Sequence, residues 1–107
     1  MGGTPQRMRE NTLFRTARAE EDLIEIWSHI AFDSLAAADR LLDAIEARWQ
    51  LLATQPRSGA LRGDLGSDIR QVVVGKYLTF YRIDDQQVVI LRVVHGKRGI
   101  DPDDMAD

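Results

Sequence analysis

The chain has 107 residues, of which 44% are hydrophobic and 29% are charged. This length predicts one domain, because two halves would each be too short to bury a core of their own. The absence of cysteine excludes disulfides and thiolate metal sites, and two histidines are too few for a convincing zinc site. No apolar run approaches the roughly 20 residues that cross a bilayer, so no membrane span is predicted. We expect a cytoplasmic protein, and we expect no cofactor.

The net charge of −3 hides a separation of charge along the chain. Residues 17–56 carry three basic and eight acidic side chains, a net charge of −5. Residues 69–100 carry six basic and two acidic side chains, a net charge of +4. An anionic partner should therefore prefer the second of these segments, and a cationic partner the first.

The chain begins with a polar segment that contains glycine and proline and lacks the apolar centre of a secretory signal. We expect residues 1–11 to be a flexible leader or a cloning remnant. Residues 12–100 are predicted to form the domain. Residues 101–107 are predicted to be an acidic tail that frays or docks only loosely.

Two helices are predicted after a short extended segment at Leu13–Arg15, which needs a sheet to join. Thr16 can cap the first helix, because its side-chain oxygen can accept from free backbone amides, and apolar spacing extends this helix to about Asp33. Ser34 is a suitable cap for a second helix, which Pro56 must end. The two helices would form a tight αα-hairpin.

The apolar stripe of the first helix is wider than one buried face requires. Six apolar positions sweep about 160° around the helix, against the roughly 100° that suffices for burial. One edge of the stripe can therefore serve a partner, and we assign Ile24, Trp27 and Ala31 to this edge. At helical spacing within apolar stripes, Trp27 and Trp49 are more typical of core residues than of recognition residues.

Residues 56–67 are rich in glycine, proline, serine and aspartate and are predicted to form a loop. Three β-branched or aromatic runs follow, at residues 69–74, 77–83 and 88–95, and the short connections between them favour antiparallel hairpins. The predicted fold class is α+β in two layers, with the helical hairpin packed on one face of an antiparallel sheet.

Strict alternation along the last run assigns its side chains to two faces. Val89, Leu91 and Val93 would share one face. Ile90 and Arg92 would lie on the other. One face can bury against the helices, and the other is a candidate working surface because a sheet need not hide both sides.

Basic and aromatic side chains, among them Tyr81, gather on or just beyond adjacent strands. Such a cluster can hold a phosphate and, in suitable geometry, activate a ribose 2′-hydroxyl. The structural alternatives are that His95 packs at a strand end and bonds a backbone carbonyl, and that Arg92 is paired with a carboxylate of the helices. Lys97 and Arg98 lie in a glycine-bounded loop, where contact with a macromolecule competes with a solvated charge pair.

The segments GSDIRQVVVGKYLTFYRI and VVILRVVHGKR carry a specific ordered pattern. Its members are Arg70, Gly75, Tyr77, Tyr81, Arg82, Arg92, His95 and Arg98. Together with the helical hairpin, this pattern resembles the ParE branch of the RelE/ParE superfamily of toxins from type II toxin-antitoxin systems, over about residues 13–100. The resemblance implies a β-α-α-β-β-β fold, a ParD-type antitoxin that wraps the toxin, and DNA gyrase as the usual target.

The resemblance and the charge pattern together predict two contact surfaces. The antitoxin would cover Ile24, Trp27 and Ala31, and operator DNA would be bound only indirectly, through the antitoxin. The target would contact the basic half of the domain. The predicted target-binding residues are Arg70, Lys76, Tyr81, Arg92, His95, Lys97 and Arg98.

Two other functions stay open beside that of a binding inhibitor. Relatives in the RelE branch are ribosome-dependent mRNA endonucleases, and in that case Arg70, Arg92 and His95 would be the catalytic residues. Those nucleases carry a tyrosine shortly after the last strand, whereas here Gly96 follows His95 and residues 99–107 contain no tyrosine. This departure favours an inhibitor that binds rather than an enzyme. The third alternative is a non-toxic binding adaptor.

Overall fold

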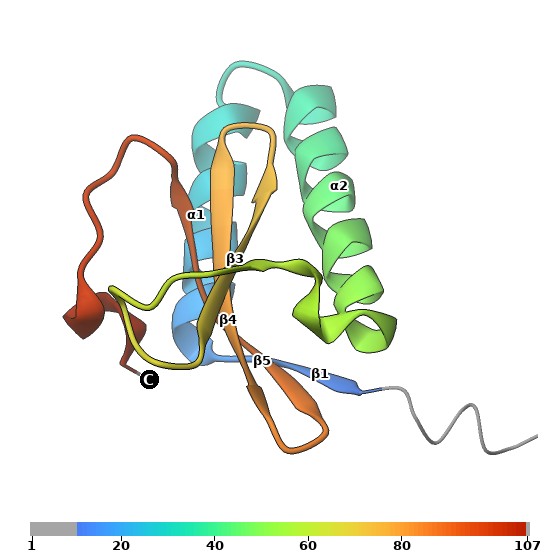
Figure 1. The fold of residues 1–107 in the computed structure, drawn as a ribbon. Coiled ribbons are helices and arrows are strands. Elements are labelled where there is room, and N and C mark those ends of the chain that lie inside the picture. The colour runs from blue at the N-terminus through green and yellow to red at the C-terminus, as the bar shows by residue number, and fades with distance from the viewer. Residues whose placement is uncertain (1–10, 107) are drawn as a thin grey trace, which may run out of the picture.

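The computed structural model describes residues 11–106, so the predicted leader lies almost entirely outside the described residues. Two helices, α1 (Ala17–Ala31) and α2 (Leu35–Thr54), pack behind a five-stranded sheet (Figure 1). This arrangement confirms the predicted α+β fold. The remaining elements are the strands β1 (Thr12–Arg15), β2 (Ala60–Leu61), β3 (Ile69–Val74), β4 (Tyr77–Asp84) and β5 (Gln87–His95) and the 3-10 helices η2 (Pro56–Ser58) and η3 (Pro102–Met105).

The strands lie in the order β1-β5-β4-β3-β2, and every neighbouring pair is antiparallel except β1 and β5. The predicted extended segment at Leu13–Arg15 joins the sheet by pairing in parallel with β5. The segment predicted as a loop contains the short strand β2, which pairs with β3. Gly75 adopts a φ of 58° in the turn between β3 and β4, a conformation that glycine adopts without strain.

Both helices begin where the capping residues predict. The side-chain oxygens of Thr16 and Ser34 accept from the backbone N–H groups of Ala19 and Ala37, each at 3.1 Å. The Thr16 hydroxyl also donates to the carbonyl oxygen of Ile90 at 2.9 Å, which attaches the start of α1 to β5. Within residues 11–106, neither helix is long and apolar enough to cross a membrane.

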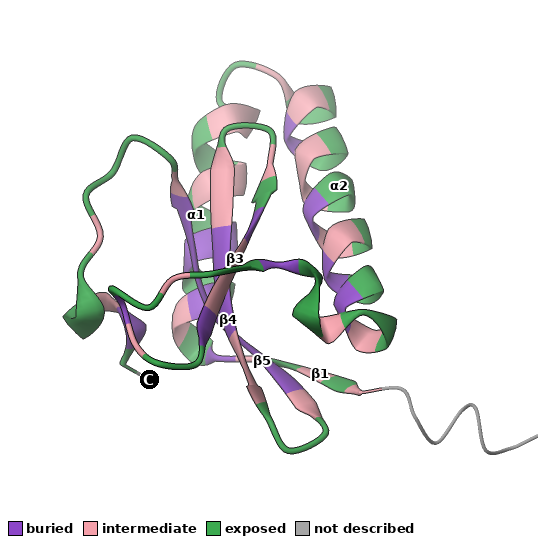
Figure 2. Cartoon of the chain, in the orientation of Figure 1, coloured by how far each residue is buried: buried purple, intermediate pink, exposed green. Residues whose placement is uncertain are grey.

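The helices bury one face of the sheet in a cluster that we call the inner core. Trp49 of α2 is 1% exposed, and its indole Nε1–H donates to Thr79 Oγ1 at 3.0 Å. Figure 2 shows buried residues along the sheet-facing side of α2 and through the middle of β4 and β5. The inner core consists of Ala19, Leu23, Ile45, Trp49, Leu52, Val72, Tyr81, Val88, Ile90 and Val93.

A β-bulge inserts one extra residue, Leu91, into β5 opposite the Phe80–Tyr81 step of β4. Side chains beyond the bulge therefore exchange faces. Val89 and Leu91 pack on the outer side of the sheet, whereas Val93 belongs to the inner core. The prediction that these three valine and leucine side chains share one face is wrong, because it assumed an unbroken period of two.

The outer face of the sheet is covered in part, so the open working surface is smaller than expected. Near the turn between β3 and β4 this face stays open, and Val73 there is 57% exposed. The loop after β2 contributes Leu65 and the C-terminal helix η3 contributes Met105, which is 7% exposed. The tail is therefore packed on the sheet and does not fray within the described residues. This second cluster, the outer core, consists of Leu65, Ile69, Phe80, Val89, Leu91, Val94 and Met105.

The two tryptophans, both expected in the core, have different surroundings. Trp27 is half-buried and lies outside the inner core, in the seam between the two helices beside Leu42. Its indole Nε1–H donates to Asp39 Oδ1 of α2 at 2.9 Å. The predicted core position is confirmed only for Trp49, because the seam at Trp27 is open to solvent on one side.

Candidate functional site

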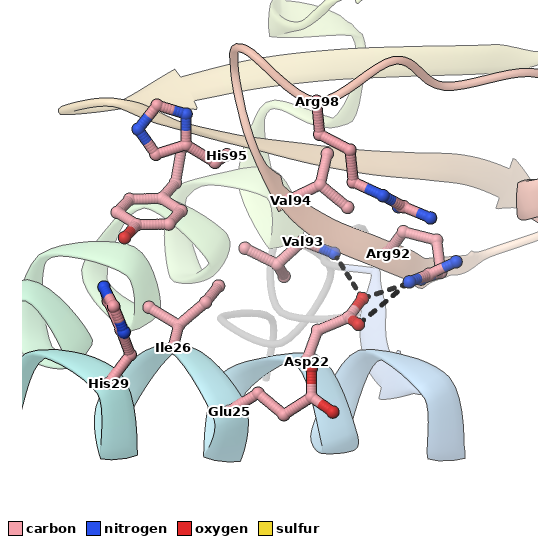
Figure 3. Close-up of a pocket in the computed structure, with 10 residues that line it drawn as sticks. Asp22, Glu25, Ile26, His29, Arg92, Val93, Val94, His95 and Arg98 are labelled. Atoms are coloured by element: carbon pink, nitrogen blue, oxygen red, sulfur yellow. Dashed lines mark hydrogen bonds and ion pairs between the residues drawn. The ribbon is translucent and has the colours of Figure 1, made fainter.

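Asp22 of α1 and Arg92 of β5 form a buried ion pair (Figure 3). Arg92 Nε donates to Asp22 Oδ2 at 2.7 Å and Nη2 donates to Oδ1 at 3.0 Å, a bidentate arrangement. The same Oδ2 accepts the backbone N–H of Val93 at 2.9 Å, on the part of β5 that β1 does not reach. The hydrogen bonding of the guanidinium to the Asp22 carboxylate is the main reason why the pKa of Arg92 is raised above its ordinary value.

Burial leaves Arg92 little surface for a partner, since the residue is 6% exposed. Its remaining nitrogen, Nη1, lies 3.6 Å from Asp104 Oδ1 in η3 and donates to the Asp104 carbonyl oxygen at 3.3 Å. Of the two interpretations of Arg92, pairing with a helix carboxylate is the one found in the structure. The guanidinium holds α1, β5 and η3 together.

Asp104 connects Arg92 to the loop that follows β5. Its Oδ1 lies 3.2 Å from Arg98 Nη2, and its Oδ2 accepts the backbone N–H of Asp101 at 3.0 Å. The pKa of Asp104 is lowered from its ordinary value, first by the hydrogen bond from Asp101 and then by the nearby charges of Arg98 and Arg92. The carboxylate therefore stays charged between the two arginines.

Tyr81 and Arg70 hold the corner between α2 and β2. Tyr81 is fully buried, and its hydroxyl donates to the Pro56 carbonyl at 2.6 Å and accepts from the Gly59 N–H at 3.0 Å. A Cβ atom on Gly59 would lie 2.5 Å from this hydroxyl, so the corner requires glycine. Arg70 Nη1 donates to the carbonyls of Gly59 at 2.8 Å and Arg57 at 3.2 Å. Burial raises the pKa of Tyr81, which remains a neutral phenol.

A cleft of about 450 Å³ lies between α1 and the end of β5. Figure 3 shows His29 of α1 on one side of the cleft and His95 of β5 on the other, with Asp22 and Arg92 paired at one end. Arg70 does not line this cleft, so the three residues predicted for a nuclease do not meet there. Within residues 11–106, no group of three or more histidine, aspartate or glutamate side chains is placed to hold a metal ion.

His95 is half-buried at the end of β5. Its ring packs edge-to-face against Tyr77, with 5.3 Å between the ring centroids and an interplanar angle of 79°. Nδ1 accepts the backbone N–H of Lys97 at 3.1 Å, so the neutral ring carries its proton on Nε2. His95 thus shapes the loop after β5, through a backbone N–H rather than the carbonyl expected from the sequence.

Lys76 and Lys97 border a shallow hollow of about 360 Å³ beside the turn between β3 and β4. Both residues are exposed, and their side chains have no ion-pair or hydrogen-bond partner in the part of the chain that the structure describes. Val73, which is 57% exposed, and Leu78 supply an apolar lining. The lysine hollow, as we call it, thus unites three predicted target-binding residues, because His95 also lines it. Its members are Val73, Gly75, Lys76, Leu78, His95, Gly96 and Lys97.

A shallow groove with a volume of about 290 Å³ lies on the helical side of the molecule, between α1 and α2. Ile24 is 63% exposed there, and Trp27 is half-buried beside it. Ala31, the last residue of α1, is half-buried and does not line this groove. We call it the helix groove. It is lined by Arg15, Glu20, Leu23, Ile24, Trp27, Leu42 and Glu46.

Two residues that were not singled out from the sequence, Asp22 and Asp104, organise the ionic contacts of the site. Asp22 lies three residues after the buried Ala19 and four before Ile26, a spacing that places it on the sheet-facing side of α1. This spacing is the signal that could have found it. No comparable local signal marks Asp104, whose arginine partners approach it only in the folded chain.

Comparison with known proteins agrees with this arrangement. The family model for the ParE toxin of the type II toxin-antitoxin system parDE matches residues 13–100. Toxin ParE3 of Caulobacter vibrioides is 28% identical over 89 residues, which cover 82% of this chain and 89% of that protein. A chain in a structure of the chromosomal ParDE toxin-antitoxin system of P. aeruginosa superposes with a TM-score of 0.70 at 20% identity, covering 81% of this chain and 97% of the other.

Two further solved structures come from RelE-type systems. A chain in the toxin-antitoxin complex RelBE2 of Mycobacterium tuberculosis is 34% identical with a TM-score of 0.56, covering 80% of this chain and 98% of that one. A mutant of the E. coli toxin RelE in its free state shares the fold, with a TM-score of 0.61 at 15% identity over 82% of this chain and 85% of that one. Because the family model matches most of its length, the chain belongs to the ParE toxin family of type II toxin-antitoxin systems, within the RelE/ParE superfamily.

Proposed function

We propose that this toxin inhibits growth by binding a macromolecular target in the cytoplasm through the lysine hollow, and that DNA gyrase is this target. The observation that carries the proposal is the pairing of the cations. Arg92 is held by Asp22, whereas Lys76 and Lys97 have no side-chain partner within residues 11–106. Ammonium groups around an apolar floor can pair with a complementary acidic surface.

The surface that we propose is smaller than the set of residues predicted from the sequence. Lys76, His95 and Lys97 line it directly. Arg98 lies next to Lys97 with 45% of its side chain exposed, although it is paired with Asp104. The remaining three predicted residues do not line the hollow, and their side chains are engaged in hydrogen bonds within the fold. They are Arg70, Tyr81 and Arg92.

Two arguments favour a binding inhibitor over an mRNA endonuclease. Arg70 is bound to the backbone of the corner at Gly59, outside the cleft that holds Arg92 and His95. The chain after β5 also lacks the tyrosine that the RelE-type nucleases carry at this place. Gyrase is favoured as the target because the strand pattern of the chain resembles the ParE branch.

Replacing both Lys76 and Lys97 by glutamate should abolish growth inhibition. Each reversal turns an attractive contact into a repulsive one, so affinity for the target should fall about tenfold or more per lysine. Growth after induced expression and inhibition of gyrase supercoiling by the purified protein measure the effect. The matched control is Arg40→Glu/Arg57→Glu, which makes the same change of charge at two exposed residues outside the hollow and should keep full activity.

Three outcomes would count against parts of this proposal. Full toxicity of the double lysine variant would reject the lysine hollow as the target surface. Growth arrest by the unmodified protein without any inhibition of supercoiling, at any excess, would reject gyrase. Translation-dependent cleavage of transcripts after induction would show instead that the chain acts as an mRNA interferase.

The partner of the helix groove is, in this proposal, the cognate antitoxin, of the ParD type. Ile24 offers an exposed apolar contact, and the carboxylates of Glu20 and Glu46 border the groove. An apolar antitoxin segment with basic flanks fits this chemistry, covering Trp27 and Ala31 before it crosses toward the sheet. Operator DNA would then contact the antitoxin rather than the toxin.

The substitution Ile24→Asp should weaken antitoxin binding about tenfold or more, because burial of an isoleucine side chain contributes about 1.5–3 kcal/mol. Calorimetric titration of the toxin with its antitoxin measures the change. Leu51→Asp provides the control, since Leu51 is a 50% exposed leucine of α2 that does not line the helix groove. Unchanged affinity of the Ile24 variant would remove this residue from the interface.

A further inference from the structure

The acidic tail lies beyond the region that matches the ParE family model, yet it is attached to the sheet. The match ends at residue 100, and η3 follows it. Within η3, Met105 is buried and Asp104 is half-buried, while Pro102 and Asp103 are exposed. The tail thus contacts the rest of the chain mainly through one carboxylate and the apolar side chain next to it.

The carboxylate of Asp104 faces two guanidinium groups. Its Oδ1 lies 3.2 Å from Arg98 Nη2 and 3.6 Å from Arg92 Nη1, while the N–H of Asp101 binds Oδ2 and orients the group. Met105 enters the outer core, whose other members come from the sheet and the loop after β2. A charge-assisted contact beside an apolar anchor is how an acidic peptide ligand would bind.

The site under η3 is continuous with the lysine hollow. Leu78 lines that hollow and also packs against the outer core. Lys97 and Arg98 are neighbours in the loop after β5, and the first borders the hollow while the second binds the tail. The hollow and the site under η3 therefore adjoin along this loop.

We propose that the site under η3 docks an acidic segment of the target protein, and that the chain's own tail occupies this site as an intramolecular ligand. In the docked state, a carboxylate of the target takes the place of Asp104 and an apolar side chain takes the place of Met105. The existence of the docking site is inferred from the contacts of the tail. Only the assignment of the docked segment to the target protein rests on the proposed function. The tether of the tail gives it an effective concentration on the order of mM, so the target segment must displace it.

A labelled peptide with the sequence of residues 100–106 tests the site directly, because it can make the contacts of the tail in trans. Fluorescence anisotropy should show that Asp104→Asn/Met105→Ser, in which the tail is released, binds this peptide about tenfold or more tightly than the unmodified protein does. Adding Arg98→Ala to the released variant should weaken peptide binding about tenfold. The matched control, Asp103→Asn, changes an exposed tail carboxylate and should bind as weakly as the unmodified protein.

The docking site would be overturned if the released variant and the unmodified protein bound the peptide equally well. It would also be overturned if a released variant that still melts cooperatively did not bind the peptide. If the double variant does not fold, Asp104→Asn alone retains Met105 and gives the same comparison. The released variant should also arrest growth at a lower level of induction. If the released variant binds the peptide but is no more toxic than the unmodified protein, the target is not the source of the docked segment. Full toxicity of Lys76→Glu/Lys97→Glu would reject only the proposed target surface.

Discussion

Replacing Asp22 by alanine is expected to lower the free energy of unfolding by about 3–5 kcal/mol, the usual effect of removing one member of a buried ion pair. The variant would leave the Arg92 guanidinium, in a residue that is 6% exposed, without its bidentate partner. It would also deprive the Val93 N–H of its acceptor, which adds the penalty of an unsatisfied buried donor. Denaturant unfolding followed by tryptophan fluorescence measures the loss.

Glu21→Ala is the matched control, because Glu21 is an exposed acid on the same turn of α1. Its effect should stay within about 0.5 kcal/mol. The double variant Asp22→Leu/Arg92→Met should recover much of the lost stability, since it removes both buried charges together. A loss of less than about 1 kcal/mol in Asp22→Ala, the range of a surface ion pair, would show that the pair does not hold α1 on the sheet.

Replacing Trp49 by alanine should destabilise the fold by about 3–5 kcal/mol, because it leaves a cavity where a fully buried indole packs. Trp49 belongs to the inner core, and its Nε1–H is bonded to Thr79 Oγ1. The ring also lies under the guanidinium of Arg15, whose Cζ is 4.9 Å from the ring centroid. Thermal melting followed by circular dichroism gives the change in stability.

Trp27→Ala is the comparison that separates a core tryptophan from a surface one. Trp27 is half-buried, lies outside the inner core and donates its indole N–H to the exposed Asp39, so its loss should destabilise the fold by clearly less. The same variant should weaken antitoxin binding, because Trp27 lines the helix groove. Equal destabilisation by the two tryptophan variants would contradict the different surroundings assigned to them.

The different positions of arginine and lysine, one buried in an ion pair and the other at the surface, follow from their chemistry. A planar guanidinium can bind both oxygens of a carboxylate and loses less on desolvation, so Arg92 suits a buried pair with Asp22. An ammonium group is compact and strongly hydrated, and Lys76 and Lys97 accordingly remain at the surface. The basic charge of residues 69–100 is therefore divided between groups that hold the fold and groups open to a partner.

Local chemistry was sufficient to predict most of the secondary structure. The hydroxyls of Thr16 and Ser34 cap the two helices as expected, and α2 ends at Thr54, shortly before Pro56. The strand runs were also found within one or two residues of their observed bounds. Caps, breakers and apolar periodicity act over a few residues, so their effects can be followed along one segment of chain.

The candidate site was predicted less completely. Lys76, His95 and Lys97 do line one hollow, as their positions beside adjacent strand ends suggested. Tyr81 and Arg92, both predicted to contact the target, are buried, and Arg92 forms the pair with a helix carboxylate that was its alternative interpretation. Their partners, at the corner before β2 and on α1, lie 22 to 70 residues away in the chain. A local sequence pattern does not predict contacts between residues so far apart in the chain.

By itself, the sequence determined the helical hairpin, every strand except β2, the separation of charge and the resemblance to the ParE toxins. Only the tertiary structure decided which cations remain open to a partner. One extra residue at Leu91 reverses the faces of β5 beyond it, and the Asp104 carboxylate meets Arg92 and Arg98 only once the tail has packed on the sheet. Periodicity describes one element at a time, whereas the neutralisation of a charge depends on which elements the whole fold brings together.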